Sequence, residues 1–232
     1  MKKYQEIIER CKSADKRFWA SDNIARLLQP GEKEQLIDEA TEAFETVLDT
    51  LIIDRHTDPN SKGTARRLAK MYFNELLAGR YDYRPDATAF PNEPDHITNE
   101  KYDGMLVVRS ELKSVCSHHH QPVTGVAYIG IIAADTLIGL SKYTRIAQWC
   151  ARRGTLQEEL AMDIAREITN ATGSEDVGVY IQAVHGCCEN RGIMAHSSLT
   201  QTTVLKGAFK EDSATKKEFM DNIKLQQEFA PR

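Results

Sequence analysis

Apolar side chains recur every three or four positions through much of the first third of the chain. Residues 1–30 carry this spacing in short runs, which predict one or two amphipathic helices. A longer apolar stripe predicts a helix over residues 32–53, and the same spacing returns over residues 64–77. Between these two helices, residues 54–63 are polar and contain Pro and Gly, so they predict a loop.

The pattern changes after residue 103, where alternating and β-branched apolar residues replace the helical spacing. The preceding residues 80–103 are rich in Pro, Asp and Asn and predict an irregular segment. Strands are predicted over residues 105–115, 123–133, 177–184 and 200–205. Further helices are predicted over residues 142–152, 155–171 and 214–227. The hydroxyl-rich run 197–203 is interpreted as part of an edge strand.

This order of elements predicts an α+β fold. We expect a four-stranded antiparallel sheet with two helices between its second and third strands, preceded by N-terminal helices, with the helices on one face of the sheet. Three regions are predicted: a helical extension (1–30), a helical N-terminal region (31–103) and a sheet domain (104–232). An open sheet of this kind exposes its edges, which favours closure by oligomerisation.

Composition narrows the class of protein. The chain has 232 residues, 41% of them hydrophobic, which is enough for one sizeable core. Its formal net charge of -4 gives no indication of a nucleic-acid or membrane-surface protein. Five cysteines, two of them adjacent, make a poor disulfide framework and suit a reducing compartment. The charged N-terminus predicts no signal peptide, and no apolar window predicts a membrane span, so we expect a cytoplasmic protein.

Two short stretches carry metal-binding chemistry: Cys116–His120, which reads C-S-H-H-H, and His185–Cys188, which reads H-G-C-C. Thiolate and imidazole are the ligands that Zn²⁺ prefers. Two cysteines and one histidine would leave a fourth position for water, which is typical of a catalytic site. The alternative is a closed structural site with His120 or Cys188 as the fourth ligand, although closed sites favour short C-x-x-C pairs.

Five motifs in order resemble the GTP cyclohydrolase I family over roughly residues 109–209. They are C-x-H-H at 116–119, G-L-S-K at 139–142 followed by Arg145, Gln157-Glu158, H-x-C at 185–187, and Arg191-Gly192. Upstream, T-A-R-R-L-A-K-M-Y at 64–72 resembles the family's T-P-x-R-x-A-K-M-Y helix start, whereas residues 1–30 match nothing recognisable.

The resemblance implies a role for each half of the metal site. Cys116, His119 and Cys187 would bind Zn²⁺, and His118 would remain a free acid or base. A zinc-bound water has a pKa of roughly 7, so hydroxide becomes available for attack on C8 of a purine. The family match implies that His185 protonates N7 and so makes C8 more electrophilic. For an isolated histidine, a hydrogen-bonded strand histidine would be the preferred interpretation, but His185 lies two residues before the expected ligand Cys187.

The resemblance also implies the substrate contacts. Gln157 and Glu158 would recognise guanine, because a carboxylate can accept hydrogen bonds from both N1–H and the 2-amino group. Phosphate binding is implied for Ser141, Lys142, Arg145 and Arg191. The plainer alternatives are an acidic first helical turn for the Gln157-Glu158 pair and solvated surface charge for the basic residues.

The implied reaction converts GTP to 7,8-dihydroneopterin triphosphate and formate, as part of pterin or tetrahydrofolate biosynthesis. The implied fold of the 104–232 domain is the tunnelling fold, whose units form a barrel, with two stacked pentamers making a homodecamer and active sites between subunits. Ser117 departs from the family's usual Glu. It therefore keeps open a same-fold enzyme acting on another purine-type nucleotide. A second alternative is a non-catalytic, zinc-stabilised oligomer that only binds nucleotides.

Overall fold

The computed structural model describes residues 1–229 and divides them into two compact units. The N-terminal unit contains residues 1–83 together with 152–154, and the sheet unit contains residues 84–151 and those from 155 onward. Each unit buries apolar side chains of its own. No helix among the described residues is both long and apolar enough to cross a bilayer.

The N-terminal unit is helical, as the apolar spacing predicts. Its helices are α1 (Lys3–Ser13), α2 (Glu32–Thr50), α3 (Thr64–Met71) and α4 (Ala78–Tyr81), with a 3₁₀ turn at Ala25–Leu27 and a π-helical turn at Tyr72–Leu76. The predicted helix over 64–77 therefore changes its hydrogen-bonding pattern after Met71. A change to π-helical bonding lets one turn widen without ending the helix.

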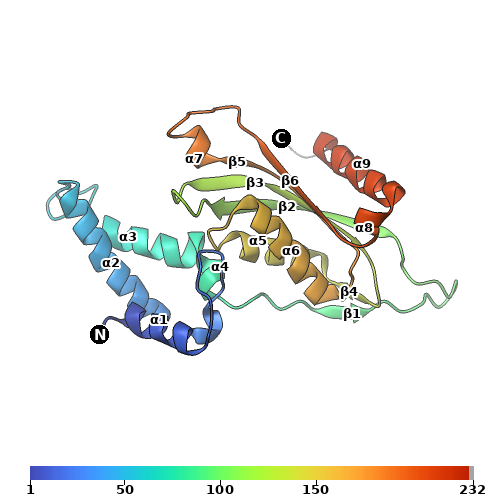
Figure 1. Ribbon diagram of the computed structural model, residues 1–232, viewed down its shortest axis with the longest axis horizontal. Coiled ribbons are helices and arrows are strands. Elements are labelled where there is room, and N and C mark those ends of the chain that lie inside the picture. Colours follow the sequence, from blue (N-terminus) through green and yellow to red (C-terminus); the bar gives the residue numbers. More distant parts are fainter. Residues whose placement is uncertain (230–232) are drawn as a thin grey trace. The chain divides into compact units, whose positions relative to one another are not determined.

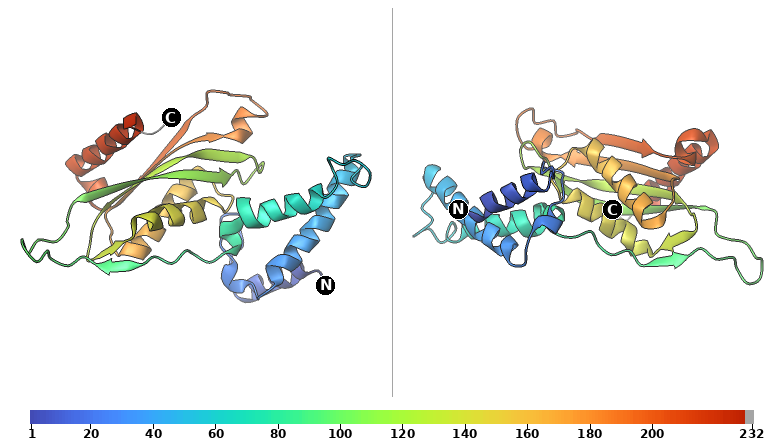
Figure 2. Two further views of the ribbon diagram at one scale, coloured as in Figure 1. Left: turned by 180° about the vertical axis from the view of Figure 1, so that it is seen from behind. Right: turned by 60° about the horizontal axis from the view of Figure 1, so that its bottom comes forward.

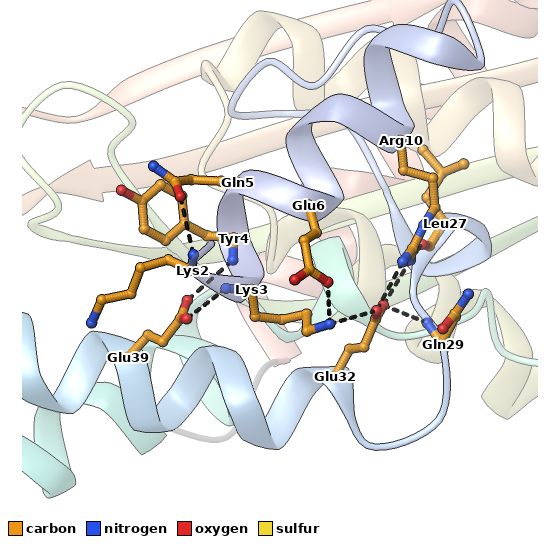
Figure 3. Close-up of polar contacts among 10 residues, drawn as sticks. All are labelled: Lys2, Lys3, Tyr4, Gln5, Glu6, Arg10, Leu27, Gln29, Glu32 and Glu39. Atoms are coloured by element: carbon orange, nitrogen blue, oxygen red, sulfur yellow. Dashed lines mark hydrogen bonds and ion pairs between the residues drawn. The ribbon is translucent and has the colours of Figure 1, made fainter.

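Helix α1 is held on α2 by both apolar and polar contacts. Ile7 and Cys11 of α1 are buried with Leu36 of α2. At the start of α1, the Glu39 carboxylate accepts hydrogen bonds from the backbone N–H groups of Lys3 and Tyr4, at 2.6 and 3.1 Å (Figure 3). The carboxylate thus satisfies donors that the first turn of any helix leaves free.

The sheet unit is built on four antiparallel strands in the order β2-β3-β5-β6 (Figure 1). These are β2 (Met105–Val115), β3 (Pro122–Ile132), β5 (Val177–His185) and β6 (Thr200–Leu205). All four predicted strands are confirmed to within a residue at each end. A second, two-stranded sheet pairs β1 (Ala89–Pro91) with β4 (Thr136–Ile138). Strands of three residues are too short to show a periodicity, so the sequence did not predict this sheet.

Two helices between β3 and β5 cover one face of the four-stranded sheet, as predicted. They are α5 (Leu140–Ala151) and α6 (Gln157–Thr172). Their buried side chains, such as Ile146 and Ile164, pack with Ile129, Val179 and Ile181 of the strands. Because neighbouring residues of a strand point to opposite faces, these odd-numbered positions of β3 and β5 all face the two helices.

The expectation that all helices lie on that one face is wrong. Helices α8 (Ala208–Glu211) and α9 (Ser213–Phe229) pack on the opposite face, as Figures 1 and 2 show. The even-numbered strand positions there carry Tyr128 and Tyr180, which pack with the aromatic rings of α8 and α9. Gly178 makes room for these rings, since a Cβ at this position would lie 2.8 Å from Phe209.

Candidate metal centre and active site

The strand register brings the two predicted metal-binding stretches to one end of the sheet. The turn between β2 and β3 contains Cys116 and the histidines that follow it, and its ends are joined by a hydrogen bond from the Cys116 N–H to the Gln121 carbonyl. The last residue of β5, His185, pairs with Val123 at the start of β3. The chain that follows His185 therefore runs beside this turn, although almost 70 residues separate the two in sequence.

A glycine allows the close approach of these two segments. Helix α7 (Gly186–Glu189) follows β5 directly and contains both Cys187 and Cys188. A Cβ on Gly186 would lie 2.9 Å from the carbonyl oxygen of Pro122, closer than real side chains come. Any larger residue at this position would push α7, and with it Cys187, away from the β2–β3 turn.

Cys116, His119 and Cys187 offer three ligand atoms that all lie within 4.8 Å of one another. Ligands of one tetrahedral zinc ion lie roughly 3.5–3.8 Å apart, given metal–ligand bonds of about 2.0–2.3 Å. The side chains therefore need to move only slightly to meet at one ion. Cys116 is buried, Cys187 is half-buried and His119 is exposed, so the group opens toward solvent on the histidine side.

The chemistry of this ligand set also fits a cation. Burial, together with the neighbouring Cys116 and Cys188 thiols, raises the pKa of Cys187 to about 11. Two thiolates this close repel each other, and a bound cation is what allows both to ionise at neutral pH. Among the residues that the structure describes, the group of mutually close ligands includes neither His120 nor Cys188. This favours a three-ligand centre over the closed alternative.

His118 lies next to this group without being part of it. Its Nδ1 is 4.0 Å from the Cys116 sulfur, and its ring centroid is 6.2 Å from that of His119. The side chain is exposed. The turn therefore brings the His119 imidazole to the two thiols and leaves the His118 imidazole exposed beside them.

His185 is held by a hydrogen bond to α6, which is itself hydrogen-bonded to β6. Its Nε2 lies 2.8 Å from Oε1 of Gln157, the first residue of α6. The Gln157 side-chain amide in turn donates to the Thr200 carbonyl at 3.2 Å and to the Thr202 hydroxyl at 2.9 Å. Burial lowers the pKa of His185, and the negative charge of Glu158 acts in the opposite direction.

Sequence reasoning interpreted the hydroxyl-rich run as an edge strand, and β6 is indeed at the edge of the four-stranded sheet. It missed the second role of that strand, which is to hold Gln157. No sequence signal indicated this role, because the Gln157 amide donates to the Thr200 backbone carbonyl and the Thr202 hydroxyl, 43 and 45 residues away in the chain.

The predicted phosphate-binding residues lie at the surface. Ser141 and Arg145 are exposed and Lys142 is half-buried at the start of α5, while Arg191 is exposed in the segment after α7. Within residues 1–229 no ion pair joins Lys142, Arg145 or Arg191 to a carboxylate, and no hydrogen bond or ion pair joins them to the metal group. Their charges are thus available to an anion, but this chain does not bring them into contact with the ligand set.

Metal-dependent hydrolytic enzymes typically combine three protein ligands with nearby acid–base groups. Here two thiols and one imidazole form the ligand group, and two further histidines and a carboxylate flank it. Comparison with known proteins agrees. The sequence model of the family described as GTP cyclohydrolase I matches residues 40–224.

Several curated relatives are similar over most of their length. The protein named GTP cyclohydrolase 1 of Flavobacterium johnsoniae is 40% identical over 198 residues, which cover 84% of this chain and 85% of the relative. The protein of the same name from Aeromonas salmonicida is 36% identical over 202 residues, covering 87% and 88%. That of Yersinia pseudotuberculosis is 38% identical over 170 residues, covering 72% and 74%. This chain belongs to the GTP cyclohydrolase I family.

Proposed function

We propose that this protein converts GTP to 7,8-dihydroneopterin triphosphate and formate in a zinc-dependent reaction. The observation that carries the proposal is the meeting of Cys116, His119 and Cys187 at one end of the sheet, beside His185. Membership of the GTP cyclohydrolase I family supports the same activity.

Cys116, His119 and Cys187 would hold the ion, which when bound supplies a Lewis acid that makes water nucleophilic at neutral pH. His185 donates a proton to N7 of the guanine and regains one later, which makes C8 open to attack. The ordinary imidazole pKa of about 6.5 suits both transfers, and burial in this protein lowers it. His118, exposed beside the ligand set, is the second group that can move protons there.

Base selectivity is assigned to the start of α6. The Glu158 carboxylate is exposed and accepts hydrogen bonds from N1–H and the 2-amino group of guanine, a donor pair that adenine lacks. The resemblance would assign Gln157 to the same recognition, but its side chain is buried and hydrogen-bonded to Thr200, Thr202 and His185. Ser141, Lys142, Arg145 and Arg191 hold the triphosphate, since the three cations have no carboxylate partner among residues 1–229.

Assembly completes the proposal. Strands β2 and β6 are the two edges of the four-stranded sheet within the described chain. Pairing of such edges between copies would form the barrel of a tunnelling fold, and two stacked pentameric rings would form a decamer with active sites between subunits. Five cysteines, two of them adjacent, suit a reducing compartment, which supports a cytoplasmic location.

Turnover of GTP by the purified protein tests the proposal, with formate and the fluorescence of the oxidised pterin measured in parallel. We expect both products, loss of both on treatment with a chelator, and recovery with Zn²⁺. Nucleotide binding without either product would instead indicate the non-catalytic oligomer. Formate released only from a different purine nucleotide would indicate a same-fold enzyme of other specificity, for which Ser117 is the pertinent departure.

A further inference from the structure

The side-chain amide of Gln157 has only one orientation that satisfies its neighbours. Its Nε2 lies 3.2 Å from the Thr200 carbonyl oxygen and 2.9 Å from the Thr202 hydroxyl. A carbonyl oxygen can only accept, so the amide nitrogen must face it; the flipped amide would set two acceptors against each other. The amide oxygen, Oε1, therefore faces His185.

That orientation determines which ring nitrogen of His185 carries a proton. Oε1 of Gln157 is an acceptor, and it lies 2.8 Å from Nε2 of His185. A hydrogen bond at this distance requires a proton on Nε2. The neutral imidazole is therefore the Nε2–H form, and its lone pair is on Nδ1. No second hydrogen bond to this ring is present among residues 1–229.

Gln157 itself has no freedom to adjust. Gln157 is only 4% exposed, and both N–H groups of its side-chain amide already donate hydrogen bonds to β6. Apolar side chains of the sheet and α6, including Leu112, Ile181 and Leu160, line the small cavity around this amide and the His185 ring. Water therefore has little room to replace either partner.

We infer that Gln157 is a positioning residue for His185, supported by Thr202, and that it makes Nδ1 the ring nitrogen that exchanges the proton with the substrate. This inference rests on the proposed function, in which His185 transfers a proton to the purine. The role inferred for the Gln157 side chain is therefore to position His185, not to contact guanine. The amide holds the imidazole in one tautomer and one plane, as carboxylates and carbonyls do for other working histidines.

Gln157→Met tests the inference, since methionine keeps the length and loses the amide. We expect kcat for GTP to fall at least about 100-fold, the typical contribution of a placed acid or base. KM should change less than about 3-fold, and the zinc content of the purified protein should stay the same. A raised KM with unchanged kcat would overturn the inference in favour of a guanine contact.

Gln182→Met is the matched control. Gln182 is a half-buried residue of β5 whose amide oxygen accepts a hydrogen bond from Gln227 at 2.9 Å. Its even-numbered position faces away from α6. Turnover by this variant should match wild type, and a loss of kcat equal to that of Gln157→Met would overturn the specific role of Gln157.

A milder pair of variants keeps the test valid if Gln157→Met does not fold. Thr202→Val removes one of the two acceptors of the amide and should lower kcat roughly 2- to 10-fold, the value of one hydrogen bond. Thr202→Ser keeps the hydroxyl and should restore kcat. Thr203→Val, on the exposed opposite side of the same strand, is the control. Equal kcat for Thr202→Val and Thr203→Val would overturn the part played by Thr202.

Neutron diffraction of the wild-type protein reads the tautomer without any turnover. Deuterium on Nε2 of His185, directed at Gln157, supports the inference, whereas deuterium on Nδ1 alone overturns it. The two hypotheses can therefore fail separately. A wild-type protein that does not act on GTP contradicts the proposed function, and an unprotonated Nε2 in a protein that does act on GTP contradicts only the inference.

Discussion

Neutralising Glu32 should loosen the attachment of α1 to α2. The Glu32 side chain is 4% exposed, and its carboxylate accepts two hydrogen bonds from the Arg10 guanidinium, at 2.7 and 2.9 Å (Figure 3). The N–H of Gln29 donates a third, at 2.8 Å. The Arg10 hydrogen bonds are the main reason that the pKa of Glu32 falls to about 2, with further lowering by the Gln29 N–H and by the charges of Arg10 and Lys3.

The lowered pKa of Glu32 determines how much stabilisation Glu32→Gln should lose. A pKa of 4.5 in the unfolded chain against about 2 in the folded one corresponds to about 3 kcal/mol, at roughly 1.4 kcal/mol per unit. Arg10 is 29% exposed and so partly solvated, and we therefore expect about 2–3 kcal/mol. Because the folded-state pKa is lowered, this stabilisation is present above pH 4.5 and is lost as the pH falls from 4.5 toward 2.

Amide hydrogen exchange of α1, followed by mass spectrometry, measures this contribution locally. In Glu32→Gln at pH 7, residues 3–13 should exchange roughly 30- to 150-fold faster than in wild type, which is the expected free energy expressed as an opening equilibrium. The free-energy difference between the two proteins should shrink as the pH is lowered. At pH 3 it should be about half of its value at pH 7.

The exposed pair of Lys2 and Glu42 is the control. Both side chains are about half or more in solvent, at 49% and 65%, so Glu42→Gln should leave exchange in α1 unchanged. Equal exchange in wild type and Glu32→Gln at pH 7 would refute the reasoning. It would mean that the cost of burying the ions cancels their attraction, as happens in some buried pairs.

Three further outcomes follow from the sheet unit. Cys187→Ser should purify without stoichiometric zinc while Cys188→Ser retains it, and zinc in both variants would contradict the ligand assignment. Gly178→Ala should cost about 1–3 kcal/mol in denaturant unfolding, because its Cβ would lie 2.8 Å from Phe209; an unchanged midpoint would contradict this packing. Glu158→Gln should lower kcat/KM for GTP by at least about 10-fold through the lost charged hydrogen bonds, and wild-type kinetics would remove Glu158 from base recognition.

Much of this architecture could be anticipated from periodicity. The four strands of the main sheet and the helices α2, α5, α6 and α9 each extend over enough residues for their apolar repeat to be recognised. The short elements could not be found in this way. Strands β1 and β4 have three residues each, and α4, α7 and α8 have four, so none completes a recognisable repeat.

The candidate site likewise contains residues that the sequence predicted and a contact that it did not. Residue type was enough to predict a metal site of cysteine and histidine, because few other roles require two thiols and adjacent imidazoles. The choice of Cys116, His119 and Cys187 came from the family resemblance, and these three side chains do lie together. The bond between Gln157 and His185 was not predictable. It joins residues 28 positions apart on a helix and a strand, and it exists because the end of β5 lies against the start of α6.

Local patterns in the amino-acid order were therefore sufficient for the longer elements and for recognising thiol and imidazole groups able to bind a metal, since both depend on neighbouring residues and on side-chain type. Folding added the parts that depend on long-range register. The pairing of Val123 with His185, the close approach at Gly186 and the second helical layer of α8 and α9 all bring together residues far apart in the chain. Such contacts arise from the packing of the whole sheet unit, which no short stretch of sequence encodes.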